Sequence, residues 1–378
     1  MNHAALLLAG AALLQAENYD TANPHDQAAQ LAERLKSGAV KLPFDAKNGY
    51  LPALLKQFHI SISSQVLVFS KTSLQASRIS RQAPRAVYFN DDTYVGWVKP
   101  SVQFGEVMEI TSVDPKVGTI FYSMNQQETA TPEIKRRDEC LHCHVSPQTE
   151  GVPGLFIRSV FPDSEGFAVL SRGSFLSDHR SPLSKRWGGW YVSGTNGGQR
   201  HMGNSHLPGR GLSGQLDMEA GANQRDLSPF VNTEPYLSPH SDIVALMVLE
   251  HQARAQNLIF RCQKDPSAAD ALADYLLFTD EAALTAPIEG VSGFAAEFAA
   301  RGPFDKRGRS LREFDLKTRM FRYPLSYMIY SASFDNIPIQ TRKRVYKRIF
   351  AALDGTPALE ILRATKNIRP ERAKILKL

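Results

Sequence analysis

The residues best suited to chemistry are two cysteines and a histidine near the middle of the chain. Cys140, Cys143 and His144 form the sequence Cys-Leu-His-Cys-His. The spacing Cys-x-x-Cys-His is typical of c-type haem attachment, because the two thiols can form thioethers with the porphyrin vinyl groups and the next residue then lies beneath the iron. We therefore expect one haem c bound covalently through Cys140 and Cys143, with His144 as the proximal iron ligand.

Three other interpretations of the cysteine pair explain less of the motif. A redox Cys-x-x-Cys pair needs a thioredoxin-like βαβ context, which the sequence does not show. A zinc site needs a second ligand pair of comparable spacing, and the only other cysteine is Cys262. A disulfide accounts for the cysteines but not for His144. We expect Cys262 to be a small buried apolar side chain.

The second axial ligand of the iron has several candidates. The glycine-rich segment 199–206 contains His201, Met202 and His206. A thioether ligand such as Met202 raises the haem potential, whereas a second imidazole such as His201 keeps it lower. His251 is a further candidate, and an open sixth position is the remaining alternative. We expect the ligand to be Met202 or His201.

The elements that must position these residues change in character along the chain. Apolar, β-branched runs bounded by turn residues predict strands at 66–70, 86–89, 93–98, 107–111, 118–124, 155–160, 167–170 and 190–193. Apolar periodicity and capping residues predict helices at 26–36, 51–57, 243–252, 270–277, 292–300, 341–353 and 356–362. The expected fold class is α+β, with a β-rich N-terminal half that includes the haem-binding segment and a mainly α-helical C-terminal half.

Composition divides the chain into four regions. Residues 1–16 are predicted to be a signal peptide, since the apolar run from Ala4 to Leu14 is too short to span a bilayer. Residues 17–130 form a β-rich region, 131–237 the haem c-binding region and 238–378 the helical region. No later stretch is apolar enough for a transmembrane helix. We expect a periplasmic or otherwise exported protein, because c-type haem is normally attached after export.

Charge is distributed unevenly. Residues 301–378 contain 19 Lys or Arg and 7 Asp or Glu, whereas the whole chain has a net charge of only +6. A basic C-terminal surface favours docking of an acidic redox partner protein and speeds encounter with it. Nucleic acid is not an expected partner of an exported haem protein.

The motif resembles the attachment site of c-type cytochromes, which implies a haem c cofactor. That resemblance covers Cys140–His144 and the export signal only, because small helical cytochromes carry the motif near the start of a much shorter chain. The segments 88–97 (Tyr-Phe-Asn-Asp-Asp-Thr-Tyr-Val-Gly-Trp) and 187–193 (Trp-Gly-Gly-Trp-Tyr-Val-Ser) are similar to those of large, uncharacterised bacterial secreted proteins with a single haem motif. This second resemblance implies neither a fold nor a function.

These observations favour an exported mono-haem c-type cytochrome that acts in electron transfer. Two alternatives stay open. A peroxidase-type haem enzyme would need an open distal site with acid–base groups, for which His201, Arg200, His206 and His251 are available. A haem subunit of a larger redox complex is the other alternative. A distal Met or His ligand favours the carrier and a vacant polar pocket favours the enzyme, so whether the chain is an enzyme is left undecided.

Overall fold

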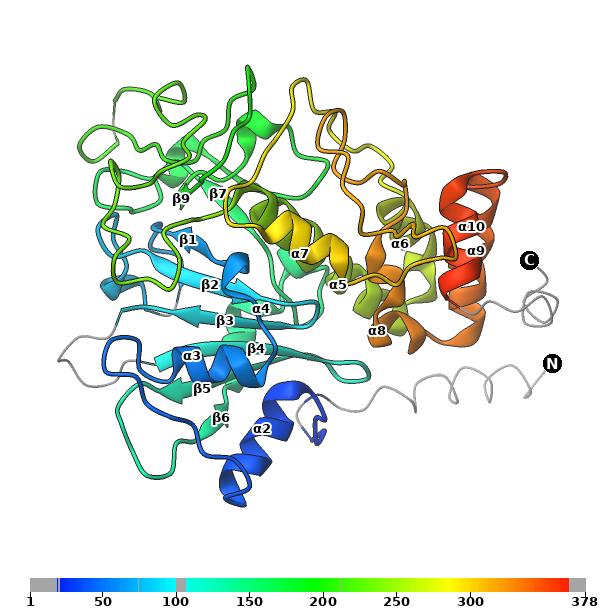
Figure 1. Cartoon of the computed structure of the whole chain (residues 1–378), viewed down its shortest axis with the longest axis horizontal. Coiled ribbons are helices and arrows are strands. Elements are labelled where there is room, and N and C mark those ends of the chain that lie inside the picture. The colour runs from blue at the N-terminus through cyan, green and yellow to red at the C-terminus, as the bar shows by residue number, and fades with distance from the viewer. Residues whose placement is uncertain (1–18, 20, 74, 100–106, 212, 367–378) are drawn as a thin grey trace, which may run out of the picture.

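A single antiparallel sheet forms the centre of the computed structural model, which describes residues 19, 21–73, 75–99, 107–211 and 213–366 (Figure 1). Its seven strands have the order β6-β5-β4-β3-β2-β1-β9. Their bounds are β1 Val66–Val68, β2 Arg85–Phe89, β3 Thr93–Trp97, β4 Val107–Asp114, β5 Gly118–Asn125, β6 Ile134–Arg136 and β9 Trp190–Tyr191. The chain is mainly helical after the sheet, which confirms the predicted α+β class.

In two predicted hairpins, the turn residues accept backbone hydrogen bonds through their side-chain oxygens. The Asn90 side-chain oxygen accepts hydrogen bonds from the backbone N–H groups of Asp92 and Thr93 between β2 and β3. Asp114 closes the β4–β5 turn in the same manner, accepting from Lys116 and Val117 at 2.8 and 2.9 Å. Such side chains mimic the backbone bonds of a turn. These two of the predicted hairpins are therefore confirmed.

The two faces of the sheet are covered by different elements. Helices α2 (Gln27–Lys36) and α3 (Leu51–Gln57) cover one face, and Trp97, Ile110 and Tyr122 belong to that core. Alternate residues of a strand point to opposite faces. The other face, to which Phe121 points, is packed by the long helix α5 (Ile243–Lys264) and the short helix α4 (Leu141–His144); Figure 1 shows α3 in front of the sheet and α4 behind it.

Helix α5 organises the C-terminal half. Its N-cap Asp242 accepts hydrogen bonds from Val244 and Ala245, as a capping carboxylate should. The helix crosses the sheet, where Gln252 donates a 2.7 Å hydrogen bond to the Tyr94 hydroxyl. The remaining helices are α6 Ala269–Leu276, α7 Phe294–Ala300, α8 Ala332–Asp335, α9 Ile339–Ala352 and α10 Pro357–Thr365. No helix within the described ranges is long and apolar enough to cross a membrane.

Some details after the motif differ from prediction. Strand β7 (Arg158–Val160) pairs with β8 (Ser174–Leu176), whereas the predicted partner 167–170 contributes only the bridge between Pro162 and Ala168. The short strand β6 was not predicted, because three residues cannot show an alternating pattern. Residues 195–237 hold no regular helix or strand among those described, which confirms the predicted loop. The predicted signal peptide lies outside the described residues.

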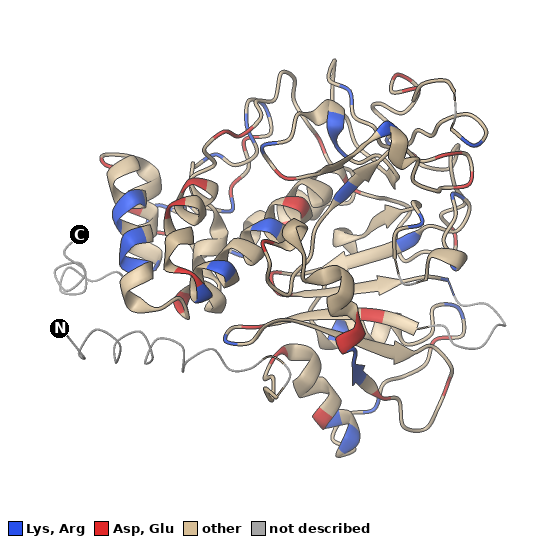
Figure 2. Ribbon diagram, turned by 180° about the vertical axis from the view of Figure 1, so that it is seen from behind, with Lys and Arg blue, Asp and Glu red and all other residues tan. Residues whose placement is uncertain are grey.

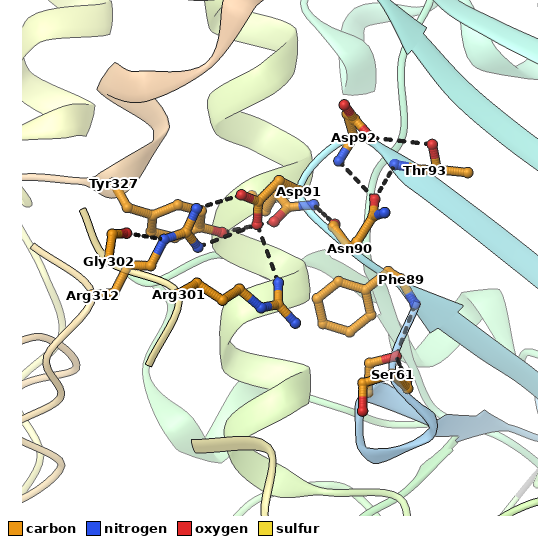
Figure 3. A network of polar contacts seen from close by, with 12 residues as sticks. Ser61, Phe89, Asn90, Asp91, Asp92, Thr93, Arg301, Gly302, Arg312 and Tyr327 are labelled. Atoms are coloured by element: carbon orange, nitrogen blue, oxygen red, sulfur yellow. Dashed lines mark hydrogen bonds and ion pairs between the residues drawn. The ribbon is translucent and has the colours of Figure 1, made fainter. Parts of the chain in front are cut away.

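A polar cluster ties the β2–β3 turn to the C-terminal half (Figure 3). Asp91 pairs with Arg301 at 3.3 Å and also with Arg312, a largely buried side chain. The Arg312 guanidinium lies 4.4 Å from the ring centre of Tyr327 and donates to the Gly302 carbonyl. These contacts join segments more than 200 residues apart, so the sheet and the helices are locked together at this turn.

Many basic residues of the C-terminal region have acidic neighbours. Arg344 and Arg348 on α9 pair with Asp270 and Asp274 on α6, and Lys366 pairs with Asp335. Figure 2 accordingly shows Lys and Arg intermixed with Asp and Glu over the helical part. Part of the positive charge that the sequence concentrates here is therefore balanced within the fold.

Candidate haem-attachment site

The Cys-x-x-Cys-His motif forms one short helical turn directly after an edge strand. Strand β6 ends at Arg136, a 3₁₀ turn spans Asp138–Cys140, and α4 follows. Residues three or four apart lie on the same side of a helical turn, so Cys140 and Cys143 share a side, with His144 adjacent. Neither cysteine forms a disulfide; Cys140 is partly buried and Cys143 exposed.

Burial, followed by the negative charges of Glu139 and Glu109, raises the pKa of the Cys140 thiol to about 11. This cysteine is therefore protonated at neutral pH, unlike the reactive thiolate of a redox Cys-x-x-Cys pair. The motif's environment does not favour the dithiol-exchange interpretation.

His144 is held by the backbone on one side of its ring only. Its Nδ1 donates a 2.8 Å hydrogen bond to the Gly154 carbonyl, and the Gly154 N–H donates back to the His144 carbonyl at 3.0 Å. Its Nε2 makes no hydrogen bond with any described residue. A metal-binding histidine typically donates its other N–H to a carbonyl in this way, which sets the tautomer and the ring orientation. The arrangement therefore presents Nε2 as the available ligand atom.

Two aromatic rings enclose the imidazole. The ring centre of His144 lies 4.7 Å from that of Phe121 on β5 and 5.8 Å from that of Phe156. Burial lowers the pKa of His144, so the ring stays neutral at pH 7. Neutral imidazole is the form that ligates a metal.

Helix α5 fixes the loop that carries Gly154. Glu150 pairs with Arg254 at 2.6 Å and with Arg261 at 2.8 Å. Asn257 donates to the Leu155 carbonyl. A Cβ on Gly154 would lie only 2.0 Å from the Asn257 Oδ1 atom, so glycine is required for this close approach. The position of the His144 ring thus depends on a helix more than 100 residues later in the chain.

His201 and Met202, the predicted distal ligands, lie in a different environment. Both are buried. The Nδ1 atom of His201 accepts a hydrogen bond from the Gly203 N–H and its ring packs edge-on against Trp187. The Met202 sulfur accepts from the Ser159 hydroxyl at 3.6 Å. None of the hydrogen bonds, ion pairs or ring contacts found in the described ranges joins either residue to Cys140–His144, so their role as ligands stays a prediction.

The rings of the other histidine candidates also form hydrogen bonds with neighbouring residues. His251 is fully buried in α5, where its Nδ1 bonds His179 at 2.8 Å and its Nε2 bonds Ser326 at 2.7 Å. The ring of partly buried His206 bonds the carbonyl of Leu207. Cys262 is buried in the core, as expected. Within the part of the chain that the structure describes, no group of three or more His, Cys, Asp and Glu side chains is placed to hold a metal ion.

Sequence reasoning missed the residues that support the motif. Gly154 was visible only as a chain break after Val152-Pro153, and nothing local marks Asn257 as its neighbour. The pair formed by Arg85 on β2 and Glu109 on β4 was also missed; its charges act on His144. The only sequence signal for that pair was a charged residue at alternate positions of a strand, on a face that is partly buried.

The donor set nevertheless fits a covalent haem: two unpaired thiols on one helical turn and a neutral histidine with a free ring nitrogen. Comparison of the chain with protein-family models, curated proteins and solved structures gives no match.

Proposed function

We propose that this protein is an exported mono-haem c-type cytochrome that transfers electrons. The single observation that carries the proposal is the state of His144: Nδ1 donates to Gly154 and Nε2 is left free, beside two unpaired thiols at haem-attachment spacing. The two thiols distinguish this histidine from buried His179, whose Nε2 also has no hydrogen-bond partner among the described residues.

In an electron carrier, these residues would have different roles. Cys140 and Cys143 would hold the porphyrin through thioethers, and His144 would ligate the iron from Nε2. The bound haem supplies the one-electron couple. Gly154 orients the imidazole through its carbonyl, and the Glu150 pairs with α5 keep that carbonyl in place. A proximal ligand held this firmly needs little rearrangement when the redox state changes.

The electron must come from or pass to another protein, and we propose an acidic one. The surplus of Lys and Arg in residues 301–378 supports this partner class. Because several of these residues pair within the fold, the predicted attraction is weaker than the sequence count implies.

One observation supports the peroxidase-type alternative. The charged pair Arg85–Glu109 lies close enough to influence His144, whereas His201, Met202 and His251 are buried among partners of their own. An arginine and a carboxylate beside an open iron would provide acid–base and charge-stabilising groups. This arrangement keeps a haem enzyme as the second candidate.

An optical spectrum separates the two candidates. The protein would be exported in a host with haem-attachment machinery and recorded oxidised, reduced, and reduced with CO. A low-spin c-type spectrum that CO does not change means that both axial positions are filled, as a carrier requires. Prompt CO binding would make the enzyme the better proposal, and absence of covalent haem would refute both.

A further inference from the structure

Beside the motif, the sheet face carries partly exposed charged side chains on two inner strands. The register places Val87, Gly96, Glu109 and Ser123 in one row across β2 to β5, on the face that also carries Phe121. Val87 and Glu109 remain partly exposed although they lie on inner strands, while the alternate positions on the opposite face are buried. Val87 packs against the main hydrophobic core, whereas the Glu109 side chain keeps part of its surface open, so a ligand can approach the row at its charged end.

Two charged side chains lie on this area. Arg85 and Glu109 pair with each other, and each side chain is 22% exposed. Gly96 lies between them; a Cβ there would be 3.3 Å from the Glu109 Oε2 atom and 3.7 Å from the Arg85 Cδ. Gln75 donates to the other carboxylate oxygen of Glu109 at 3.3 Å. The missing side chain at Gly96 thus leaves room for the pair to lie against the sheet.

The pair leaves one strong donor unused. The Nε atom of Arg85 is buried and has no hydrogen-bond partner among the described residues. A buried N–H without a partner is unfavourable, and more so when the group carries a charge. Such a donor marks a place where an acceptor from outside the chain would be stabilised.

The pair is also close to the attachment motif. Glu109 lies opposite Ser123 on β5, and Ser123 accepts a hydrogen bond from Arg137, just before the motif. The ring centre of Phe121, on the same face of β5, lies 4.7 Å from that of His144. A haem joined to the cysteines of the motif would therefore lie within reach of the two charges.

We propose that this polar area of the sheet is the haem-binding surface. In this proposal Arg85 binds a propionate carboxylate of the haem and Glu109 holds Arg85 in place. The inference rests on the proposed haem attachment at Cys140 and Cys143. Arginine suits this role because its planar fork bonds carboxylates through two N–H groups, one of which is the unused Nε–H.

The proposal predicts shifts of opposite sign in the midpoint potential. Reduction removes one positive charge from the haem, so a nearby cation favours the reduced form and a nearby anion the oxidised form. In the purified holoprotein, Arg85→Gln should lower the potential and Glu109→Gln should raise it. The redox equilibrium constant should change about tenfold in each, which is about 59 mV for a one-electron couple. Arg85→Lys, which retains the charge, should shift it less than Arg85→Gln.

The measurement is an optical redox titration, with covalent haem content determined for each variant. Arg344→Gln, which removes an exposed arginine on α9, is the matched control and should leave the potential unchanged. Unchanged potentials in Arg85→Gln and Glu109→Gln holoprotein would refute the proposal that the haem binds at this surface, while leaving the cytochrome proposal intact. If Arg85→Gln fails to fold, the isosteric Glu109→Gln decides alone. Lack of covalent haem in the unaltered chain would instead refute the proposed function.

Discussion

Two histidine sites in this molecule contrast in how their ring nitrogens are used. In the buried pair, His251 bonds His179 and Ser326 through its two nitrogens, and Tyr275 stacks on its ring. At the motif, His144 uses one nitrogen and leaves the other free. His179, the other member of that pair, leaves its buried Nε2 without a partner among the described residues. The difference teaches that burial, a perturbed pKa or a free ring nitrogen alone does not identify a ligand. At the motif the free nitrogen lies beside two unpaired thiols.

The two sites also differ in their charged neighbours. Near the buried pair, Arg186 and Glu250 form a 2.6 Å ion pair in which both side chains are almost completely inaccessible. Near the motif, Arg85 and Glu109 are partly exposed and retain an unused donor. The first pair has the features of a structural element and the second those of a binding surface.

The largest effect that would test this contrast is loss of the cofactor. The double variant Cys140→Ala, Cys143→Ala should lose all covalent haem, because no thioether remains possible. His251→Gln should keep full haem content. Haem that stays with the denatured polypeptide, measured by mass spectrometry, checks both. Covalent haem in the double variant, or its loss in His251→Gln, would reverse the assignment of the two sites.

The second largest expected effect is the loss of stability when the buried ion pair between Arg186 and Glu250 is broken. Glu250→Ala leaves Arg186 buried and unpaired and also removes the acceptor of the Trp187 indole N–H. The free energy of unfolding should fall by about 3–5 kcal/mol, with covalent haem still formed. Glu139→Ala, which removes an exposed carboxylate beside the motif, is the control and should leave the urea midpoint unchanged. Equal stability of the two variants would show that the buried pair is not structural.

A smaller effect is expected from crowding the carbonyl that orients His144. Gly154→Ala forces its Cβ against Asn257 and should cost about 1–3 kcal/mol of stability. It should also increase the fraction of high-spin or CO-binding haem, because the His144 ring shifts. Adding Asn257→Ala removes the obstructing atom and should restore the low-spin spectrum, with Asn257→Ala alone as the reference. No spectral change in Gly154→Ala would mean that this contact does not position the ligand.

The smallest expected effect is on the pH dependence of stability. Burial lowers the pKa of His251 to about 3, compared with about 6.5 in an unfolded chain. Between these values the unfolded chain binds one more proton, so the contribution of His251 is complete above about pH 6.5 and is lost as the pH falls towards 3.

The His251→Gln variant isolates this contribution. Its free energy of unfolding should depend less steeply on pH, by about 1.4 kcal/mol per pH unit between pH 4 and 6. Urea unfolding at pH 4, 5 and 6 provides the comparison with the unaltered chain. Parallel pH profiles for the two proteins would mean that His251 is already protonated in the fold, and the contrast with His144 would fail.

The order of hairpins and helices was largely predictable from local pattern. Asn90 to Asp92 between two β-branched runs, and Asp242 before an apolar helix, are signals that act within a few residues. The pairing of β7 with β8 was not predictable, because three-residue strands carry too little pattern to specify a partner. The candidate attachment residues Cys140, Cys143 and His144 are equally local, since the proposed chemistry requires their spacing within one helical turn.

By itself, the sequence determined the fold class and the residues that are candidates for haem attachment, because both depend on side chains close together along the chain. Only the tertiary structure decided which groups surround them. Asn257 meets Gly154, and Arg85 meets Glu109 across Gly96, through helix packing and strand register. These contacts depend on how the whole chain excludes water, a long-range property that spacing does not encode.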